Sequence, residues 1–136
     1  MTRNPACCLA TDTAVTAAEM MKAEDVGSIP VVEDRQSNKL TGILTDRDIV
    51  LKIVASGKDV NSATIDEAMT SNPVTCRPDD HLETAMDRMA QHQIRRIPIV
   101  DGKNCIVGII SQADVATRVD MPAQTAEVLE DISQSK

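Results

Sequence analysis

Residues 42–49 read GILTDRDI, and residues 108–115 read GIISQADV. In both stretches a glycine and aliphatic residues lead to a hydroxyl residue, and an aspartate follows three positions later. The pattern is typical of a strand that leads directly into a helix, because the apolar run ends at a hydroxyl that can cap a helix. Since the stretch occurs twice in one chain, it indicates an internal repeat.

The repeat extends well beyond this stretch. Residues 1–8 read MTRNPACC and residues 69–76 read MTSNPVTC, while IPVV at 29–32 returns as IPIV at 97–100. A single copy could hardly bury its own apolar face, so the two copies are expected to share a core. The sequence therefore predicts a pseudo-twofold pair of repeats with related clefts between the halves.

Composition excludes several classes of protein. With 136 residues, the chain suits one ordinary domain, and its core must be aliphatic because it has no Phe, Tyr or Trp. The net charge of −7 argues against nucleic acid, whose affinity comes largely from Lys and Arg on phosphates. No apolar run approaches the ~20 residues that span a bilayer, and nothing resembles a signal peptide. We therefore expect a cytoplasmic protein that binds neither nucleic acid nor membranes.

Each copy is predicted to fold as strand, helix, strand, strand, helix. For the first copy we expect a helix from a cap near 11–13 to about 25, strands near 29–32 and 40–44, and a helix from 46 to about 55. For the second we expect an extended segment at 73–76, a helix that ends near 93, strands at 97–100 and 105–110, and a helix from 111 to about 118. Asp79 and Asp80 are the expected caps of its first helix, with Glu83 in capping-box position.

These elements group into four segments. They are repeat 1 (1–58), a linker with a lead-in helix (59–68), repeat 2 (69–120) and a C-terminal tail (121–136), in which Pro122 could begin a terminal helix.

The order of elements and the Gly-hydrophobic-x-Thr/Ser-x-x-Asp motif resemble the CBS domain, named for cystathionine β-synthase. Two copies resemble a CBS pair, or Bateman module, and residues 42–50 are especially similar to small stand-alone bacterial CBS-pair proteins. The resemblance covers nearly the whole chain. It implies an α/β fold of the α+β type, with tandem βαββα repeats related by pseudo-twofold symmetry. One departure is that the first copy starts at Met1 without the lead-in helix that precedes the second.

The repeated motif supplies the candidate ligand-binding side chains Thr45, Asp48, Ser111 and Asp114. A helix N-terminus favours phosphate, a hydroxyl can donate to a phosphate oxygen, and a carboxylate can accept both hydroxyls of a ribose. In the family the Asp typically holds ribose and the Thr or Ser helps to hold phosphate. The alternative is a capping box, in which both side chains only satisfy backbone N–H groups.

An adenine would have to lie between aliphatic side chains and be read by backbone groups. The resemblance places it beside Val74, Thr75 and Cys76, their first-copy counterparts including Cys8, and the residues around both prolines: Ile29, Pro30, Ile97 and Pro98.

The two copies differ just before the second of these prolines. Arg95 and Arg96 replace Gly27 and Ser28 of the first copy. Two arginines could bind phosphates bidentately, or they could form a solvated basic patch. If they bind ligand, the two clefts should differ in affinity or in the number of phosphates they prefer.

The four cysteines, Cys7, Cys8, Cys76 and Cys105, have no C-x-x-C spacing. The expected role is that of reduced, buried apolar residues, and no metal site is predicted. A metal or redox site is the alternative, although His81 and His92 show no ligand spacing with them.

The function expected from these residues is that of a non-catalytic regulatory module. It would sense AMP, ADP, ATP or S-adenosylmethionine, with no cofactor required, and an unidentified protein would respond. The alternative is a ligand-free structural or interaction module, possibly regulated through its thiols, and a third reading is a regulatory fragment of a larger enzyme or transporter. Ala/Met stripes at 14–21 and 82–89 predict core-facing helices, through which CBS pairs commonly form homodimers.

Overall fold

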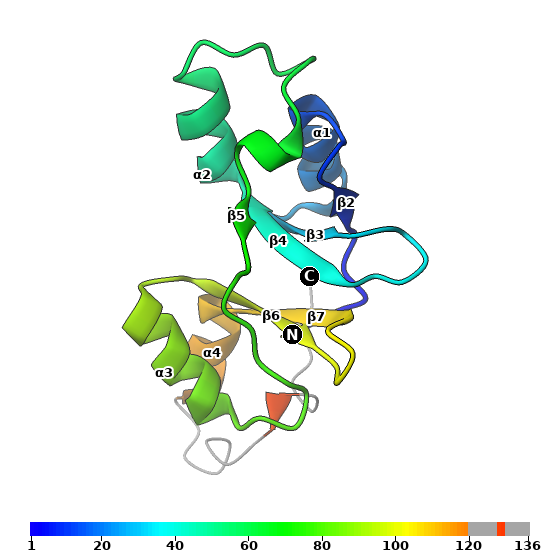
Figure 1. Ribbon diagram of the computed structural model, residues 1–136. Helices are drawn as coiled ribbons and strands as arrows, with labels where there is room; N and C mark the ends of the chain where they lie inside the picture. The colour runs from blue at the N-terminus through cyan, green and yellow to red at the C-terminus, as the bar shows by residue number, and fades with distance from the viewer. Residues whose placement is uncertain (120–127, 130–136) are drawn as a thin grey trace. The chain divides into compact units, whose positions relative to one another are not determined.

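The computed structural model describes residues 1–119 and 128–129, and it contains both helices and strands (Figure 1). The strands are β1 (Thr2–Arg3), β2 (Cys8–Leu9), β3 (Ser28–Val32), β4 (Leu40–Thr45), β5 (Thr70–Ser71), β6 (Arg96–Val100) and β7 (Ile106–Ser111). The helices are α1 (Ala14–Glu24), α2 (Asp46–Asp48), the π-helix η1 (Ile49–Val54), the single 3-10 turn η2 (Ile65–Glu67), α3 (Leu82–His92) and α4 (Gln112–Val119). The predicted α/β class is confirmed.

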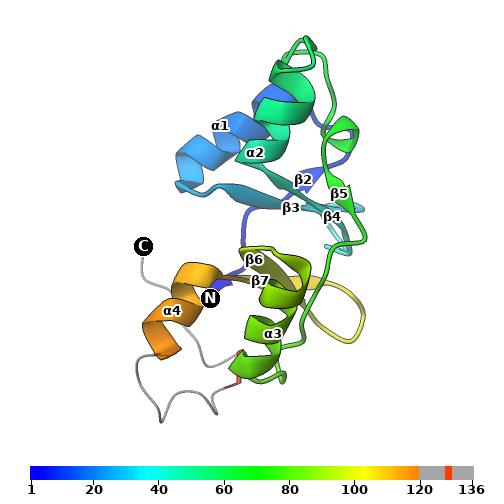
Figure 2. The same cartoon turned by 90° about the vertical axis from the view of Figure 1, so that its left-hand side faces the viewer.

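The chain forms two compact units, each built on one sheet. Residues 6–73 carry a four-stranded sheet in the order β2-β3-β4-β5, with β2 parallel to β3 and the other pairs antiparallel. Residues 1–5 and the chain from Val74 onward carry a three-stranded antiparallel sheet in the order β1-β7-β6. Within the first of these units, α1 and α2 lie on the same face of the sheet in both views (Figures 1 and 2).

The lead strand of each sequence copy pairs with the hairpin of the other copy. Thr2 lies opposite Ile109, and Thr70 lies opposite Ile43. The compact units are therefore offset from the sequence repeats by one short strand, so the fold of either copy includes a piece of the other.

A glycine permits each of these close pairings. A Cβ on Gly42 would lie 2.8 Å from the Thr70 carbonyl oxygen and 2.9 Å from Met69 Sδ. A Cβ on Gly108 would likewise lie 2.9 Å from both the Thr2 carbonyl oxygen and Met1 Sδ. Real Cβ atoms do not approach so closely, so the repeated glycine is a requirement of the lead strand that crosses it.

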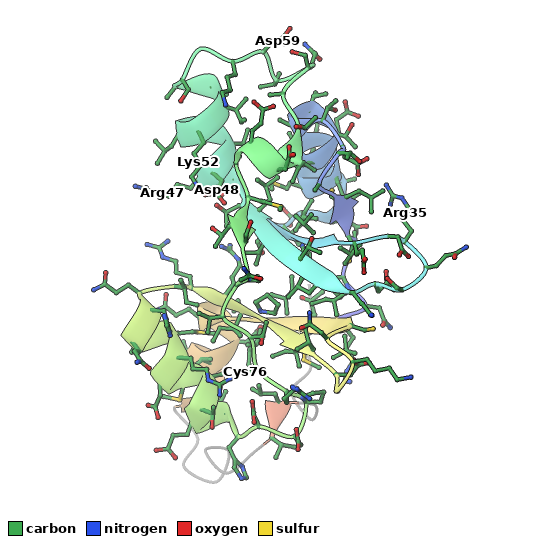
Figure 3. All side chains as sticks on the ribbon, in the orientation of Figure 1. Arg35, Arg47, Asp48, Lys52, Asp59 and Cys76 are labelled. Carbon is green, nitrogen blue, oxygen red and sulfur yellow. The ribbon has the colours of Figure 1, made fainter. Side chains whose placement is uncertain are left out.

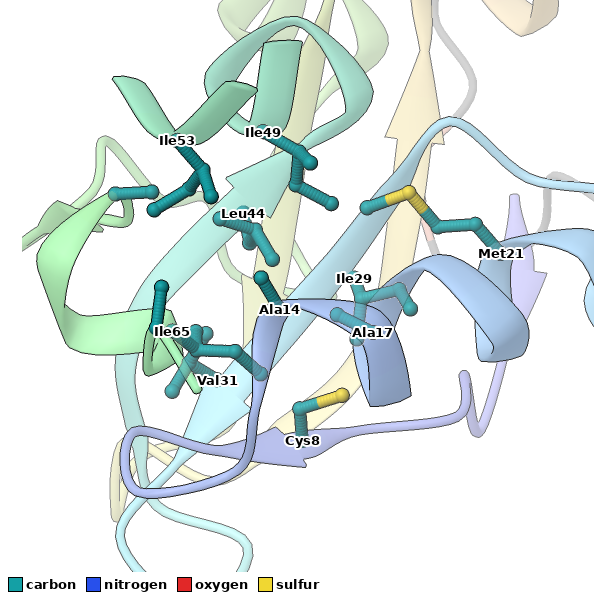
Figure 4. Close-up of a cluster of buried hydrophobic side chains, with 12 residues drawn as sticks. Cys8, Ala14, Ala17, Met21, Ile29, Val31, Leu44, Ile49, Ile53 and Ile65 are labelled. Atoms are coloured by element: carbon teal, nitrogen blue, oxygen red, sulfur yellow. The ribbon is translucent and has the colours of Figure 1, made fainter. Parts of the chain in front are cut away.

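Aliphatic side chains form the cores, as the composition requires, but in the described residues each unit has its own core and the single shared core expected from the sequence is not found. In the unit of residues 6–73, the side chains converge from the sheet, α1 and η1 (Figure 4): Cys8, Ala14, Ala17, Met21, Ile29, Val31, Leu44, Ile49, Ile53 and Ile65. In the other unit they include Met1, Cys76, Leu82, Ala85, Met89, Ile97, Ile99 and Ile110. The Ala/Met stripes are thus core faces, as predicted, except that Ala18 is exposed.

One local prediction is wrong, and a second is confirmed in its extent but with a different helix type. The helix α3 begins after His81, which makes no side-chain cap, whereas Asp80 instead accepts a hydrogen bond from the Arg77 backbone N–H at 2.8 Å. The helix expected from 46 to 55 is α-helical only at its start and continues as the π-helix η1, in which the Ala55 N–H donates to the Val50 carbonyl. A π-helical turn has the same local composition as an α-helix, so the sequence pattern did not distinguish them.

Other local predictions are confirmed. Thr13 caps α1 by accepting from the Thr16 N–H, and the lead-in helix before the second copy is the single turn η2. The terminal helix expected after Pro122 lies outside the described residues. Two residues of this region are described: Val128 forms a β-bridge with His81, and Leu129 is buried.

Replacing Gly108 by Ala is expected to destabilise the protein by about 1–3 kcal/mol, because backbone atoms of Thr2 must move to admit the new methyl group. Gly102→Ala is the matched control, since its Cβ would meet only Arg77 Nη1 at an ordinary 3.7 Å. Urea unfolding of both variants measures the effect. Equal midpoints for the two variants would contradict the role assigned to Gly108.

Candidate ligand-binding site at the strand–helix junctions

Thr45 and Asp48 form a closed capping box where β4 leads into α2. The Asp48 N–H donates to Thr45 Oγ1 at 3.1 Å, and the Thr45 N–H donates to Asp48 Oδ2 at 3.0 Å. The second carboxylate oxygen, Asp48 Oδ1, lies 3.3 Å from Lys52 Nζ. Figure 3 shows Asp48, Lys52 and Arg47 together on this helix.

Ser111 and Asp114 repeat the arrangement where β7 leads into α4. The Asp114 N–H donates to Ser111 Oγ at 3.2 Å, and the Ser111 N–H donates to Asp114 Oδ2 at 2.8 Å. Asp114 is buried, with 8% of its surface exposed, yet within the described residues its Oδ1 has no hydrogen-bond partner. A buried carboxylate oxygen without a donor is costly, which makes it a candidate to receive one from a ligand.

The capping interpretation is therefore confirmed in both copies. The caps do not use all of the hydrogen-bonding atoms of either pair of side chains. Each hydroxyl oxygen accepts a backbone hydrogen bond, which leaves its own O–H available to donate. Each carboxylate uses one oxygen in the cap; the other oxygen of Asp48 faces the Lys52 ammonium, and that of Asp114 has no partner within the described residues. The same residues can thus hold the helix start and still offer one donor and one anionic acceptor.

The strand register brings the copy-specific residues to these junctions. Arg96 pairs with Ser111 across the β6–β7 ladder, and Ser28 pairs with Thr45 across β3–β4. The carbonyl of Arg95 also accepts the Gln112 N–H at 2.7 Å. A cation therefore stands beside the second junction where the first has a small polar residue.

The segments predicted to flank adenine lie at the edges of the sheets. Cys8 pairs with Val31 in the parallel β2–β3 ladder, and Cys76 bridges to Ile99 in the same sense. The Cys76 N–H donates to the Pro98 carbonyl at 3.1 Å.

Most of these edge side chains face the cores. Cys8, Ile29 and Ile97 are fully buried and Cys76 is 1% exposed, and the strand prolines Pro30 and Pro98 are also buried. Val74 and Thr75 remain partly exposed. A ligand at these edges would therefore meet mainly backbone and the side chains of Val74 and Thr75.

Two residues at the site were missed by sequence reasoning. Lys52 follows Asp48 by one helical turn, a spacing that predicts an ion pair. Arg88 donates through Nη1 to the Thr75 carbonyl and to Cys76 Sγ, and it lies 3.7 Å from Asp80 Oδ2. The sequence carried no local signal for Arg88, whose counterpart in the first copy is Met20.

The thiols of Cys7, Cys8 and Cys76 are poor candidates for regulation by ionisation. Burial, with a smaller contribution from the Asp12 carboxylate, raises the pKa of the Cys8 thiol to about 11. Burial also raises the pKa of Cys7 and of Cys76, although Arg35 and Arg88 respectively oppose it. The raised pKa values keep these thiols largely protonated near neutral pH. Because the thiolate is the reactive form, they are expected to react slowly.

No group of three or more His, Cys, Asp or Glu side chains in the described part of the chain could hold a metal ion. None of the helices described has both the length and the apolar character needed to cross a bilayer.

Comparison with known proteins identifies the class. A family model of the CBS domain matches residues 1–55 and 65–120, so the chain belongs to the CBS-domain family and carries two copies. The resemblance seen in the sequence is thereby confirmed. CBS-domain proteins are in general regulatory and non-catalytic.

Several known proteins are similar to this chain over most of its length. The CBS domain-containing protein YhcV of Bacillus subtilis is 44% identical over 117 residues, which cover 86% of this chain and 80% of the relative. The crystal structure of Hypoxic Response Protein I with two coordinated zinc ions is 33% identical with a TM-score of 0.76, over 86% of this chain and 92% of that one. The crystal structure of CBSX2 in complex with AMP has a TM-score of 0.76 at 22% identity, over 88% of this chain and 91% of that one.

Raising the pH above 9 is expected to destabilise the protein partly through Cys8. In the unfolded chain this thiol ionises near its ordinary pKa of 9.0, whereas in the folded protein it stays protonated up to about 11. Protons are thus lost first from the unfolded state, and stability falls as pH rises through this range. Urea unfolding at pH 8 and pH 10.5 should show a smaller loss in Cys8→Ala than in wild type. An equal loss in both proteins would refute this role of Cys8.

Proposed function

We propose that this protein is a non-catalytic regulatory module that binds an adenosine-containing ligand: AMP, ADP, ATP or S-adenosylmethionine. One observation carries the proposal. The same hydroxyl and carboxylate stand at the same strand–helix junction in both copies, and each carboxylate keeps an oxygen outside its cap.

The chemistry of the junctions suits a nucleoside. An acceptor-only carboxylate oxygen matches the donors of a ribose diol, and a hydroxyl beside a helix start suits a phosphate oxygen. Val74 and Thr75 supply the partly exposed apolar and polar surface beside which a base would lie. CBSX2 was crystallised with AMP, but at 22% identity it supports the fold alone, so the ligand proposal rests on the residues of this chain.

The arginines of the second copy favour phosphate at that junction. Arg96 lies across the ladder from Ser111, whereas Ser28 lies across from Thr45. A guanidinium can bind a phosphate bidentately and a serine hydroxyl cannot. We therefore assign the more highly phosphorylated ligand to the junction of Ser111 and Asp114.

The proposed role is regulatory, so binding must be read by another protein. A ligand shifts a conformational equilibrium only by binding one state more tightly. The junction residues belong to the starts of α2 and α4, so a ligand that engages them acts on those helices.

Asn in place of Asp at positions 48 and 114 tests ligand binding without removing the caps, because the amide oxygen still accepts the backbone hydrogen bond. In wild type, ligand at a hundred times its dissociation constant should add about 2.7 kcal/mol, or on the order of ten degrees in melting temperature. Asp48→Asn and Asp114→Asn together should abolish this shift.

Glu67→Gln is the matched control for these variants. It changes a carboxylate in another capping box, at Thr64, and should leave the ligand shift unchanged. Differential scanning fluorimetry with a panel of adenine compounds supplies the measurement. If no compound shifts the wild-type protein, ligand sensing is excluded, and a shift that survives in the double variant would move the site elsewhere.

We also propose that the chain forms a homodimer through α1 and the helix beside it, η1. The core-facing side chains of α1 are already buried within the protomer, and within the Ala/Met stripe of this helix Ala18 is the residue that stays exposed to a partner. In the described residues, the large apolar side chains left exposed are those of η1: Val50, Leu51 and Val54. Apolar side chains grouped on one helix are typical of an interface.

Glutamate at both Val50 and Val54 should convert the dimer to monomer, because each would bury an unpaired charge. Ala18→Glu should weaken the dimer as well. Gln36→Glu, which adds the same charge to an exposed loop, should have no effect. Sedimentation equilibrium measures the mass of each variant. A wild-type monomer, or a dimer unaffected by the two glutamates, would refute this interface.

A further inference from the structure

Ser28 is a buried hydroxyl residue at the start of β3. Only 5% of its surface is exposed, and among the residues that the structure describes its Oγ has no hydrogen-bond partner. A buried hydroxyl that neither donates nor accepts is costly, and such groups are rare in folded proteins. The Ser28 hydroxyl therefore calls for a partner from outside the described residues, such as a ligand.

The side chain of Ser28 stands beside that of Thr45. The two residues are partners in the β3–β4 ladder, which places their Cβ atoms about 4.5–5.5 Å apart on one face of the sheet. Their neighbours in sequence, Ile29 and Leu44, point into the core (Figure 4). Because successive strand residues alternate between faces, Ser28 and Thr45 both lie on the face away from that core. The first junction therefore carries two adjacent hydroxyl groups.

Both hydroxyls can donate to the same ligand group. Thr45 Oγ1 accepts the Asp48 N–H at 3.1 Å, which leaves its proton to donate, and the Ser28 proton has no acceptor within the described residues. Two neighbouring donors suit an atom that only accepts, such as a phosphate oxygen. Arg47 and Lys52 lie beside Asp48 (Figure 3), so the local charge also favours an anion.

We propose that Ser28 is a ligand-contact residue of the first junction and that its hydroxyl binds the phosphate next to the ribose. This inference rests on the proposed function, in which Asp48 binds the ribose and Thr45 the phosphate. Ser28 is the buried member of the hydroxyl pair and Thr45 the partly exposed one. A phosphate that reaches Thr45 from solvent therefore receives the Ser28 hydrogen bond on its inner side. This junction is selective for a nucleotide over the nucleoside.

Titrations with AMP and adenosine, which differ by the phosphate alone, test the proposal. Isothermal titration calorimetry is carried out on Asp114→Asn protein, so that binding at the first junction is measured by itself. Adding Ser28→Ala should weaken AMP binding about tenfold, the effect of one hydrogen bond to a charged group, and should leave adenosine binding unchanged. Unchanged AMP affinity would overturn the proposal, and so would an equal loss of affinity for adenosine.

The melting temperature of the ligand-free protein separates a ligand contact from a structural role. Ser28→Ala removes a hydroxyl that has no partner within the described residues, so it should leave this temperature unchanged or raise it. Thr41→Val is the matched control, because the Thr41 hydroxyl, also in β4, donates to the Val31 carbonyl at 3.2 Å. It should lower the melting temperature and leave the affinities for AMP and adenosine unchanged.

The remaining outcomes are also decisive. If Ser28→Ala lowers the melting temperature as much as Thr41→Val does, Ser28 has a structural partner or holds a trapped water, and the proposal fails. A wild type that binds neither AMP nor any other adenine compound refutes the proposed function and this inference with it. Binding that ignores Ser28→Ala refutes the inference alone.

Discussion

The close crossing of a lead strand over a glycine is the constraint on which both compact units depend. Met1 and Met69 cover Gly108 and Gly42 at distances that leave no room for a Cβ. The crossing gives each sheet an extra edge strand, and it carries a methionine side chain against the hairpin beneath. Because the strand comes from the start of the other sequence copy, neither copy has its complete set of pairing partners within its own sequence. This explains physically why the repeat occurs as a pair.

The junctions that follow the two glycine-containing strands are also repeated in both copies. A helix start needs acceptors for its free N–H groups, and the hydroxyl and carboxylate supply them. Capping and ligand binding are often treated as alternatives, yet the proposed ligand contacts would use atoms of these side chains that the caps do not use. The cap uses one carboxylate oxygen and the hydroxyl oxygen as acceptors, which leaves the second carboxylate oxygen and the hydroxyl proton outside it. The cap also fixes both side chains before any ligand arrives, which lowers the entropy lost on binding.

How far the sequence predicts this structure depends on how local each signal is. The helices and the paired strands follow apolar periodicity, and the junction residues Thr45, Asp48, Ser111 and Asp114 follow from the repeat itself. The lead strands were not predicted, because two residues are too few to show an alternating pattern. The cap of α3 was misassigned since Asp80 satisfies a turn at Arg77 instead. Arg88 was missed because its contacts at Thr75 and Cys76 depend on how α3 packs, which no spacing in the sequence reveals.

Differences between the copies carry more functional information than their agreement. Equivalent positions hold Met20 and Arg88, and these change what surrounds the equivalent thiols: Cys8 donates to a thioether at 3.7 Å, whereas Cys76 accepts from a guanidinium at 3.4 Å. Arg88 also donates a hydrogen bond to the Thr75 carbonyl, so residues 74–76 have one backbone acceptor fewer to offer a base. A perfectly symmetric pair would bind two ligands identically and could report only total concentration. If the junctions bind ligand as proposed, two unequal sites would fill over different ranges of concentration, and the module could respond in two steps.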